Sequence, residues 1–232
     1  RLRERNYRVL ADHPGVEVID GEASFVDATH LRVRTDEGER TLEATRTFID
    51  TGSEPKLPPI PGMDGARVYT SESLLDVEVL PETAIIIGAG YVGLEFASLF
   101  ADFGVDVTVM QSGTDFLPRQ DAEVARAVRA NFEQRGVRFL LGADVKAVED
   151  DVAEALVVVD VDGKESRLTC DLVLVATGRR AAVEHLNLEA AGVRTDERGT
   201  IVTDEHLRTT APHIWAMGDA AEALQFTYVS YD

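Results

Sequence analysis

The residues best suited to chemistry form a glycine-rich turn, Gly88-x-Gly90-x-x-Gly93, within the stretch IIIGAGYVGLEFA at residues 85–97. The isoleucines before it are typical of a buried strand, and the apolar spacing after it is typical of an amphipathic helix. In such a turn the first glycine allows a tight bend, the second lets backbone approach a pyrophosphate, and the third lets helix and strand pack closely. The free N–H groups at the helix start would bind the phosphates. The alternative is a strand–helix turn that holds no ligand.

The choice between NAD and NADP stays open on the sequence. An acidic residue about 20 positions after such a turn binds the ribose 2′-hydroxyl of NAD, whereas an arginine accommodates the 2′-phosphate of NADP. Here the second strand ends at Gln111 and Ser112, which carry no charge. Gln111 can donate to a hydroxyl or a phosphate, and Arg119 is close enough in sequence to help bind a phosphate.

Three other strand ends could contact a nucleotide. Two apolar strands end in Thr-Gly, at residues 51–52 and 177–178, and a glycine at such an end lets a ligand approach the backbone. A third strand, at 214–217, ends in Gly218-Asp219. Asp219 either caps a helix or accepts hydrogen bonds from the ribityl chain of a flavin.

The elements that must position these turns follow from periodicity and turn signals. Around the glycine-rich turn the sequence predicts strands at 84–88, 106–110, 137–141, 143–149, 154–160 and 165–176, and helices at 90–103 and 121–135. The second helix would start at Asp121 and present Val124, Val128 and Phe132 on one face. Alternating βαβ units predict a parallel sheet with covering helices.

Upstream of that region the sequence predicts shorter elements. It indicates an N-terminal helix, a meander of short strands over 15–50 beginning with VEVID, a Pro- and Gly-rich boundary at 51–65, and a short helix at 70–76 capped by Ser71 or Thr70.

Composition limits the function classes. The net charge of −19 disfavours nucleic acid and anionic membranes as partners, and no apolar run reaches the length of a membrane span. The basic residues are arginines except for three lysines, which fits a GC-rich genome, or alternatively a salt-adapted host. The single cysteine, Cys170, excludes an internal disulfide and a cysteine zinc site. A cytoplasmic location is the expectation.

Together these motifs resemble the FAD-dependent pyridine nucleotide–disulfide oxidoreductases, which include dihydrolipoamide dehydrogenase, glutathione reductase and mercuric reductase. FLPRQD, DERGTIVTDEHLRTTAPHIWAMGD and LQFTYVSYD are most similar to the RclA-like and mercuric-reductase-like branch. The resemblance implies an α/β fold in which a Rossmann-like NAD(P)-binding domain, residues 79–198, is inserted into an incomplete FAD-binding domain, residues 1–78 and 199–232.

The resemblance also implies site residues. Tyr91 matches a lid over the nicotinamide pocket, Glu95 a glutamate near the nicotinamide, and Gln111 departs from the usual NAD-selecting glutamate. The positions implied for NAD or NADP are Gly88, Ala89, Gly90, Tyr91, Val92, Gly93, Leu94, Glu95, Gln111, Ser112, Val145 and Gly178. Those implied for FAD are Thr51, Gly52, Ser53, Asp219, Gln225, Phe226, Thr227 and Tyr228. No residue is predicted to be catalytic or to bind a metal.

Departures from the family pattern are equally informative. The sequence contains neither the Gly-rich FAD fingerprint with its Cys-x-x-x-x-Cys pair nor the C-terminal His–Glu pair and dimerisation domain. We therefore expect an internal piece of a homodimeric flavoenzyme that passes hydride from NAD(P)H to FAD and on to a disulfide, a metal ion or another small acceptor. By itself the piece would be inactive and would hold no stable flavin. The alternatives are a non-catalytic nucleotide-binding module or redox sensor, and an NADH-oxidase-type flavoprotein without a redox disulfide.

Overall fold

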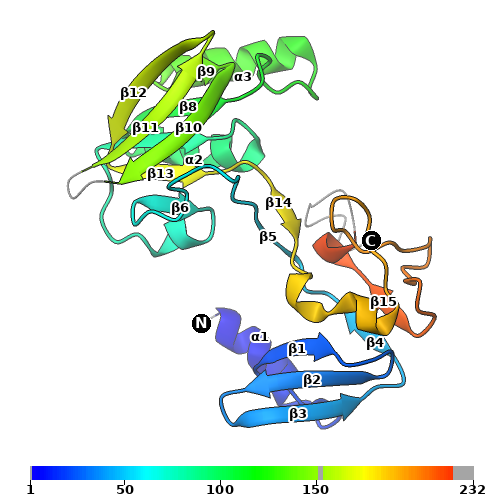
Figure 1. Ribbon diagram of the computed structural model, residues 1–232. Coiled ribbons are helices and arrows are strands. Elements are labelled where there is room, and N and C mark those ends of the chain that lie inside the picture. Colours follow the sequence, from blue (N-terminus) through cyan, green and yellow to red (C-terminus); the bar gives the residue numbers. More distant parts are fainter. Residues whose placement is uncertain (1, 151–153, 222–232) are drawn as a thin grey trace. The chain divides into compact units, whose positions relative to one another are not determined.

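The computed structural model describes residues 2–150 and 154–221 (Figure 1). The chain divides into two compact units: Arg1–Glu54 with Arg180–Asp232, and Pro55–Arg179. We call these the first and the second unit. Their limits differ from the expected domain limits at 78/79 and 198/199, because residues 68–70 pair into the sheet of the second unit and residues 181–193 pack into the core of the first.

The second unit is built on a five-stranded parallel sheet. In spatial order its strands are β6 (Val68–Thr70), β13 (Leu172–Val175), β7 (Thr83–Ile87), β8 (Asp106–Gln111) and β9 (Arg138–Leu141). The helices are α2 (Tyr91–Asp102), between β7 and β8, and α3 (Ala122–Gln134), between β8 and β9. This confirms the predicted βαβ units and their parallel sheet.

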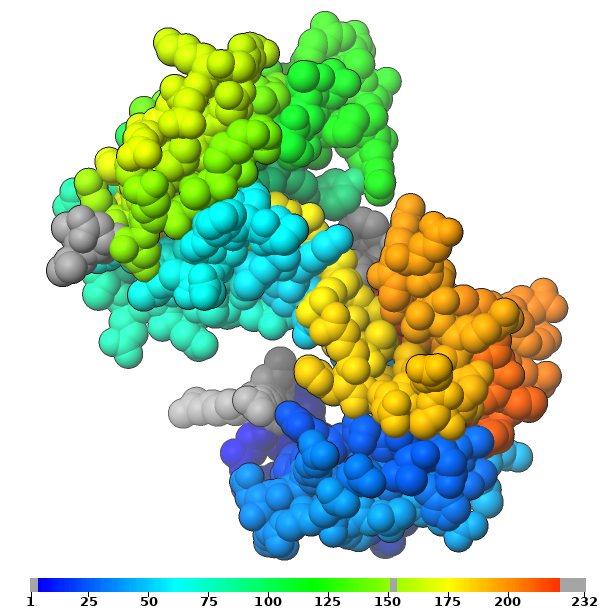
Figure 2. All heavy atoms as spheres, viewed as in Figure 1, coloured from blue at the N-terminus to red at the C-terminus, as the bar shows by residue number. Residues whose placement is uncertain are grey.

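Alternation along the parallel strands separates two cores. In β7, Ala84 and Ile86 pack with α2 and α3, whereas Ile85 and Ile87 pack with a second, antiparallel sheet. That sheet contains β10 (Ala143–Asp150), β11 (Ala155–Val161) and β12 (Lys164–Cys170). Figure 2 shows it forming an outer surface of this unit. The result is three layers: helices, parallel sheet and antiparallel sheet.

Helix α3 begins as predicted, and most of its predicted apolar face is buried. The Asp121 carboxylate accepts hydrogen bonds from the N–H groups of Glu123 and Val124, which caps the helix. Of the apolar residues expected on the buried face, Phe132 is buried and Val128 is partly buried against the same core, whereas Val124 is 52% exposed and Ala125 is buried instead. The prediction therefore holds for Val128 and Phe132, and Ala125 takes the place of Val124 at the start of the face.

The strand predicted at 165–176 is interrupted at Asp171, so that β12 and β13 belong to different sheets. The Asp171 carboxylate accepts hydrogen bonds from the N–H groups of Glu82 and Thr83 and from the Thr83 hydroxyl, over 2.8–3.0 Å. The hydrogen bond from the Thr83 N–H is the main cause that lowers the pKa of Asp171. Asp171 thereby ties the crossing between the sheets to the start of β7.

The first unit contains helix α1 (Leu2–Ala11), as predicted, and an antiparallel sheet. The strands of this sheet are β1 (Glu22–Phe25), β2 (His30–Thr35) and β3 (Gly38–Glu43). Two corrections apply: VEVID at 16–20 forms no strand, and the last part of the expected meander, β4 (Thr47–Ile49), instead pairs in parallel with β15 (Ile214–Ala216). Phe48 of β4 stacks on Trp215, with ring centroids 5.2 Å apart.

Two short strands carry the chain between the units. They are β5 (Ser53–Pro55) and β14 (Arg179–Ala181), which pair as a two-stranded sheet. The helix expected at 70–76 is only a 3-10 turn over Ser73–Asp76. Its N-cap is Glu72, whose side chain makes no capping hydrogen bond. The Thr70 hydroxyl accepts hydrogen bonds from the N–H groups of Glu72 and Ser73. Within the part of the chain that the structure describes, no helix has both the length and the apolar character needed to span a membrane.

Candidate dinucleotide site

The glycine-rich turn joins β7 to α2 at the carboxyl end of the parallel sheet. Gly88 has a φ of +112°, and a Cβ there would lie 2.3 Å from the Ala176 carbonyl oxygen, which follows β13. A Cβ on Gly93 would lie 2.0 Å from the Gly88 carbonyl oxygen. Only glycine fits either position, because no side chain tolerates a backbone oxygen at such a distance.

Gly90 has a different environment. A Cβ on this residue would meet no atom within 4 Å, and the residue is the N-cap of α2 with no side-chain cap. The N–H groups of the first helical turn are thus not occupied by a capping side chain, and the space beside them is open. This arrangement fits a pyrophosphate, because the helix start supplies donors and a favourable dipole.

Two side chains, one at the end of β8 and one in the loop after it, contact this turn and the start of α2. The Ala89 N–H donates to Oε1 of Gln111 over 3.0 Å, and Nε2 of Gln120 donates to the Tyr91 hydroxyl over 2.7 Å. Gln120 was not singled out by the sequence, because no local pattern connects a loop residue to a tyrosine 29 positions earlier. Tyr91 is 53% exposed and Glu95 is also exposed.

The other residues implied for this site are dispersed. Ser112 is exposed beside Gln111, and Val92 is half-buried in α2. The side chains of Leu94 and Val145 are 7% exposed and belong to the two cores. Val145 could therefore contact a nucleotide only through its backbone.

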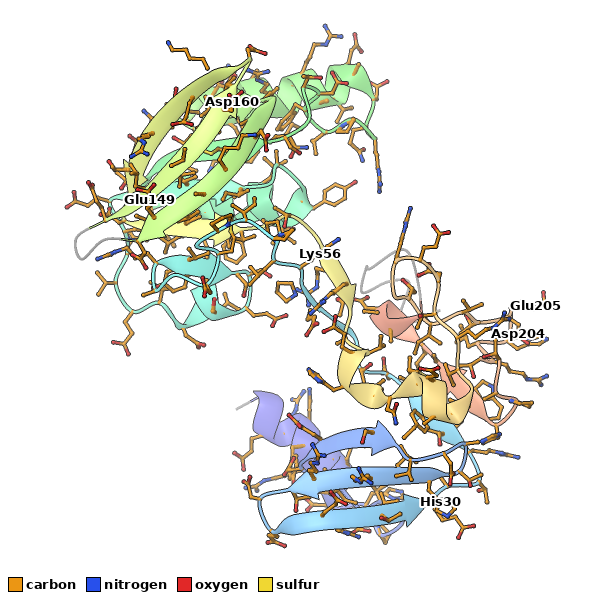
Figure 3. All side chains as sticks on the ribbon, viewed as in Figure 1. His30, Lys56, Glu149, Asp160, Asp204 and Glu205 are labelled. Carbon is orange, nitrogen blue, oxygen red and sulfur yellow. The ribbon has the colours of Figure 1, made fainter. Side chains whose placement is uncertain are left out.

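The two Thr-Gly turns resemble one another in their surroundings. Gly178 follows β13, and its carbonyl oxygen accepts from the Lys56 N–H over 3.0 Å, while the Thr177 hydroxyl donates to the Lys56 carbonyl over 2.9 Å. Figure 3 labels Lys56 on the segment after β5. In the first unit the Gly52 carbonyl oxygen accepts from the Ala182 N–H over 3.0 Å. A Cβ on either glycine would face open space.

The first unit brings Ser53 and Asp219 together. The parallel strands β4 and β15 end at the same edge, and the Ser53 hydroxyl donates to the Asp219 carboxylate over 2.6 Å. Asp219 lies inside a 3-10 turn, Gly218–Ala220, whose N-cap is Met217, so it does not act as the helix cap. Both side chains are half-buried. Gln225, Phe226, Thr227 and Tyr228 lie outside the described residues.

Two histidines of the first unit contact nearby oxygen atoms. Nδ1 of His30 lies 2.9 Å from the Asp27 carboxylate within the turn between β1 and β2 (Figure 3), and Nε2 of His213 contacts the Ala28 carbonyl oxygen. Hydrogen bonds from the Thr29 N–H and from His30 lower the pKa of Asp27 to about 2. Among the described residues, no group of three or more His, Cys, Asp or Glu side chains could hold a metal ion.

Cys170 is expected to resist thiol reagents in the folded protein. It is 2% exposed at the end of β12, and burial raises the pKa of its thiol to about 11. At pH 8 about one molecule in a thousand would carry the thiolate, compared with about a quarter for an ordinary cysteine. Labelling with dithionitrobenzoate should therefore be at least about 100-fold slower in buffer than in denaturant. Equal rates in the two conditions would contradict this burial.

Comparisons with known proteins agree with the geometry. The family model described as "Pyridine nucleotide-disulphide oxidoreductase" matches residues 1–232. The chain is 41% identical to the probable pyridine nucleotide-disulfide oxidoreductase RclA of Escherichia coli, over 100% of this chain and 52% of that protein. It is 34% identical to a mercuric reductase of Staphylococcus aureus, over 99% and 41%.

A solved structure, the Cu(II) complex of the HOCl-induced flavoprotein disulfide reductase RclA from Escherichia coli, superposes with a TM-score of 0.94 at 40% identity. The match covers 52% of the chain in that structure and 100% of this chain. The chain thus spans about half the length of the relatives it matches.

Proposed function

The chain belongs to the pyridine nucleotide-disulphide oxidoreductase family, and on that premise we propose that it is the NAD(P)-binding part, with a portion of the FAD-binding part, of an NAD(P)H-oxidising flavoprotein. Bound FAD would supply the redox chemistry by accepting a hydride from NAD(P)H and passing two electrons to a further acceptor. The residues of this chain would bind and orient the two cofactors.

The observation that carries the proposal is the glycine-rich turn. Gly88 and Gly93 bring strand and helix into close contact, whereas Gly90 leaves open space at an uncapped helix start. A turn that only joined a strand to a helix would need no glycine at position 90, since a Cβ there would meet nothing. Gly90 is explained by a ligand that approaches the backbone closely.

Two residues of the first unit support a flavin as the group that accepts the hydride. Asp219 and Ser53 lie at the carboxyl ends of two parallel strands, where ligands of open α/β sheets bind. The Asp219 carboxylate would accept hydrogen bonds from ribityl hydroxyls, and Ser53 orients it. β4 and β13 are both followed by a Thr-Gly turn, but they differ in their neighbours. Among the described residues β4 pairs only with β15, whereas β13 has a paired strand on each side. An incomplete FAD-binding sheet would have such a free edge.

The acceptor and the partners follow from the relatives rather than from this chain. Cys170 is the only cysteine in the sequence, so a dithiol step in the whole protein would need cysteines outside it. Relatives are named as reductases of mercury or of disulfides. We therefore infer a disulfide, a metal ion or another small acceptor, and a homodimeric whole protein.

Calorimetric titration with NADH and NADPH tests this function. We expect weak binding of at least one of them, because the site at the turn is formed while the flavin side is incomplete. The purified chain should be colourless. The absence of heat with both nucleotides at millimolar concentration would overturn nucleotide binding, and flavin absorbance in the purified chain would overturn the expectation that this piece holds no FAD.

A further inference from the structure

We infer that Gln111 determines the cofactor preference by presenting an N–H donor to the 2′ position of the adenosine ribose, so that the site accepts the 2′-phosphate of NADP(H). This inference rests on the proposed function and concerns one end of the same dinucleotide. NADP(H) is then accepted at a position where the uncharged residue type alone leaves the choice between NAD and NADP open.

The direction of the Gln111 amide is fixed by a backbone contact. The Ala89 N–H lies in the glycine-rich turn and donates to the Gln111 side chain over 3.0 Å. A backbone N–H can only donate, so its partner must be the carbonyl oxygen, Oε1, and the NH₂ group must point the other way. Ala89 is 4% exposed and Gln111 is half-buried, which holds the contact away from competing water.

The NH₂ group then faces the turn that follows β8. Nε2 of Gln111 lies 3.4 Å from the position that a Cβ on Gly113 would take. The turn itself is anchored, because the Gly113 carbonyl oxygen accepts from the Gly142 N–H over 3.0 Å. Within the described residues Nε2 makes no hydrogen bond. It is therefore a directed donor at the strand end where the ribose of a bound dinucleotide lies.

The chemistry of this donor favours a phosphate. A carboxylate at this position could accept from Ala89 with one oxygen and from the ribose hydroxyls with the other, and its charge would repel a 2′-phosphate. The carboxamide uses its only acceptor on Ala89 and leaves two N–H donors, which bind an anionic oxygen more strongly than a neutral hydroxyl. The exposed loop over 112–120 carries one acidic residue, Asp115, and one basic residue, Arg119, so its formal charges cancel.

Gln111→Glu is the matched test, because glutamate keeps an acceptor for the Ala89 N–H and replaces only the donor arm. The probes are 2′,5′-ADP and 5′-AMP, which represent the adenosine halves of NADP and NAD, and their dissociation constants are measured by calorimetry. We expect the wild-type chain to bind 2′,5′-ADP at least as tightly as 5′-AMP. Gln111→Glu should shift the ratio at least tenfold toward 5′-AMP.

Gln111→Leu is the control for the contact between the Gln111 side chain and the Ala89 N–H. It removes the acceptor as well as the donor, so the Ala89 N–H loses its partner and both probes should bind more weakly. A ratio unchanged in Gln111→Glu, or a wild-type chain that rejects 2′,5′-ADP while binding 5′-AMP, would overturn the role of Gln111 and leave the proposed function standing. A folded wild-type chain that binds neither probe at millimolar concentration would overturn both.

Discussion

Gly93→Ala is expected to lower the free energy of unfolding of the second unit by about 2 kcal/mol. Two effects oppose each other. Alanine favours a helix over glycine by about 1 kcal/mol, but its Cβ would lie 2.0 Å from the Gly88 carbonyl oxygen. Forcing atoms into a packed region costs about 1–3 kcal/mol or more, and here the obstacle is backbone, which cannot change rotamer. Urea denaturation followed by circular dichroism measures the difference.

Gly90→Ala is the matched control for this stability measurement. It places the same methyl group three residues earlier in the same turn, where it would meet no atom within 4 Å. Its cost should stay within about 1 kcal/mol, the usual difference between glycine and alanine at a helix N-cap. If Gly93→Ala were as stable as the wild-type chain, the close contact between α2 and the strand end would be wrong.

The second large effect is on nucleotide affinity. Here Gly90→Ala, and not Gly93→Ala, is the variant for which we expect the larger change. Gly90→Ala is expected to weaken NADPH binding about 10- to 100-fold, because its methyl group would occupy the space that the pyrophosphate needs at the helix start. That range corresponds to about 1.5–3 kcal/mol, the value of a hydrogen bond to a charged group. The dissociation constants are measured by calorimetry on variants whose circular dichroism spectra match the wild type.

Gly15→Ala serves as the control for binding. A Cβ on this residue of the first unit would lie 3.6 Å from the His13 ring, at ordinary van der Waals distance. It should change neither stability nor affinity. Unchanged affinity in Gly90→Ala would show that the open space at Gly90 is not the phosphate site.

The parallel core of the second unit could be predicted from the sequence because its signals are local. Three consecutive isoleucines, a glycine turn and a capping Asp121 each specify an element without distant contacts. The βαβ order then determines a parallel sheet. The same reasoning failed for VEVID, whose alternation is typical of a strand. Strand formation also needs a neighbour to pair with, and periodicity does not show whether one is present.

Distant pairing explains the other differences. The segment at 165–176 reads as one apolar strand, but Asp171 binds donors 88 and 89 positions earlier and so divides it between two sheets. The second compact unit begins before the expected limit at residue 78, because β6 joins the parallel sheet through β13, about a hundred residues further along the chain. In the site, the glycines and Asp219 were recognisable by type and spacing. The contact of Gln111 with Ala89 depends on the pairing of β7 with β8, and that of Gln120 with Tyr91 on how the loop after β8 folds back.

The central claim is that a dinucleotide binds at the glycine-rich turn, and amide chemical-shift mapping of the ¹⁵N-labelled chain during titration with NADPH tests it most directly. We predict that the largest shifts fall on the N–H groups of residues 88–95 and on the side-chain amide of Gln111. These changes should be absent in Gly90→Ala at the same nucleotide concentration. Saturable shifts confined to other parts of the chain, with residues 88–95 unmoved, would contradict the account.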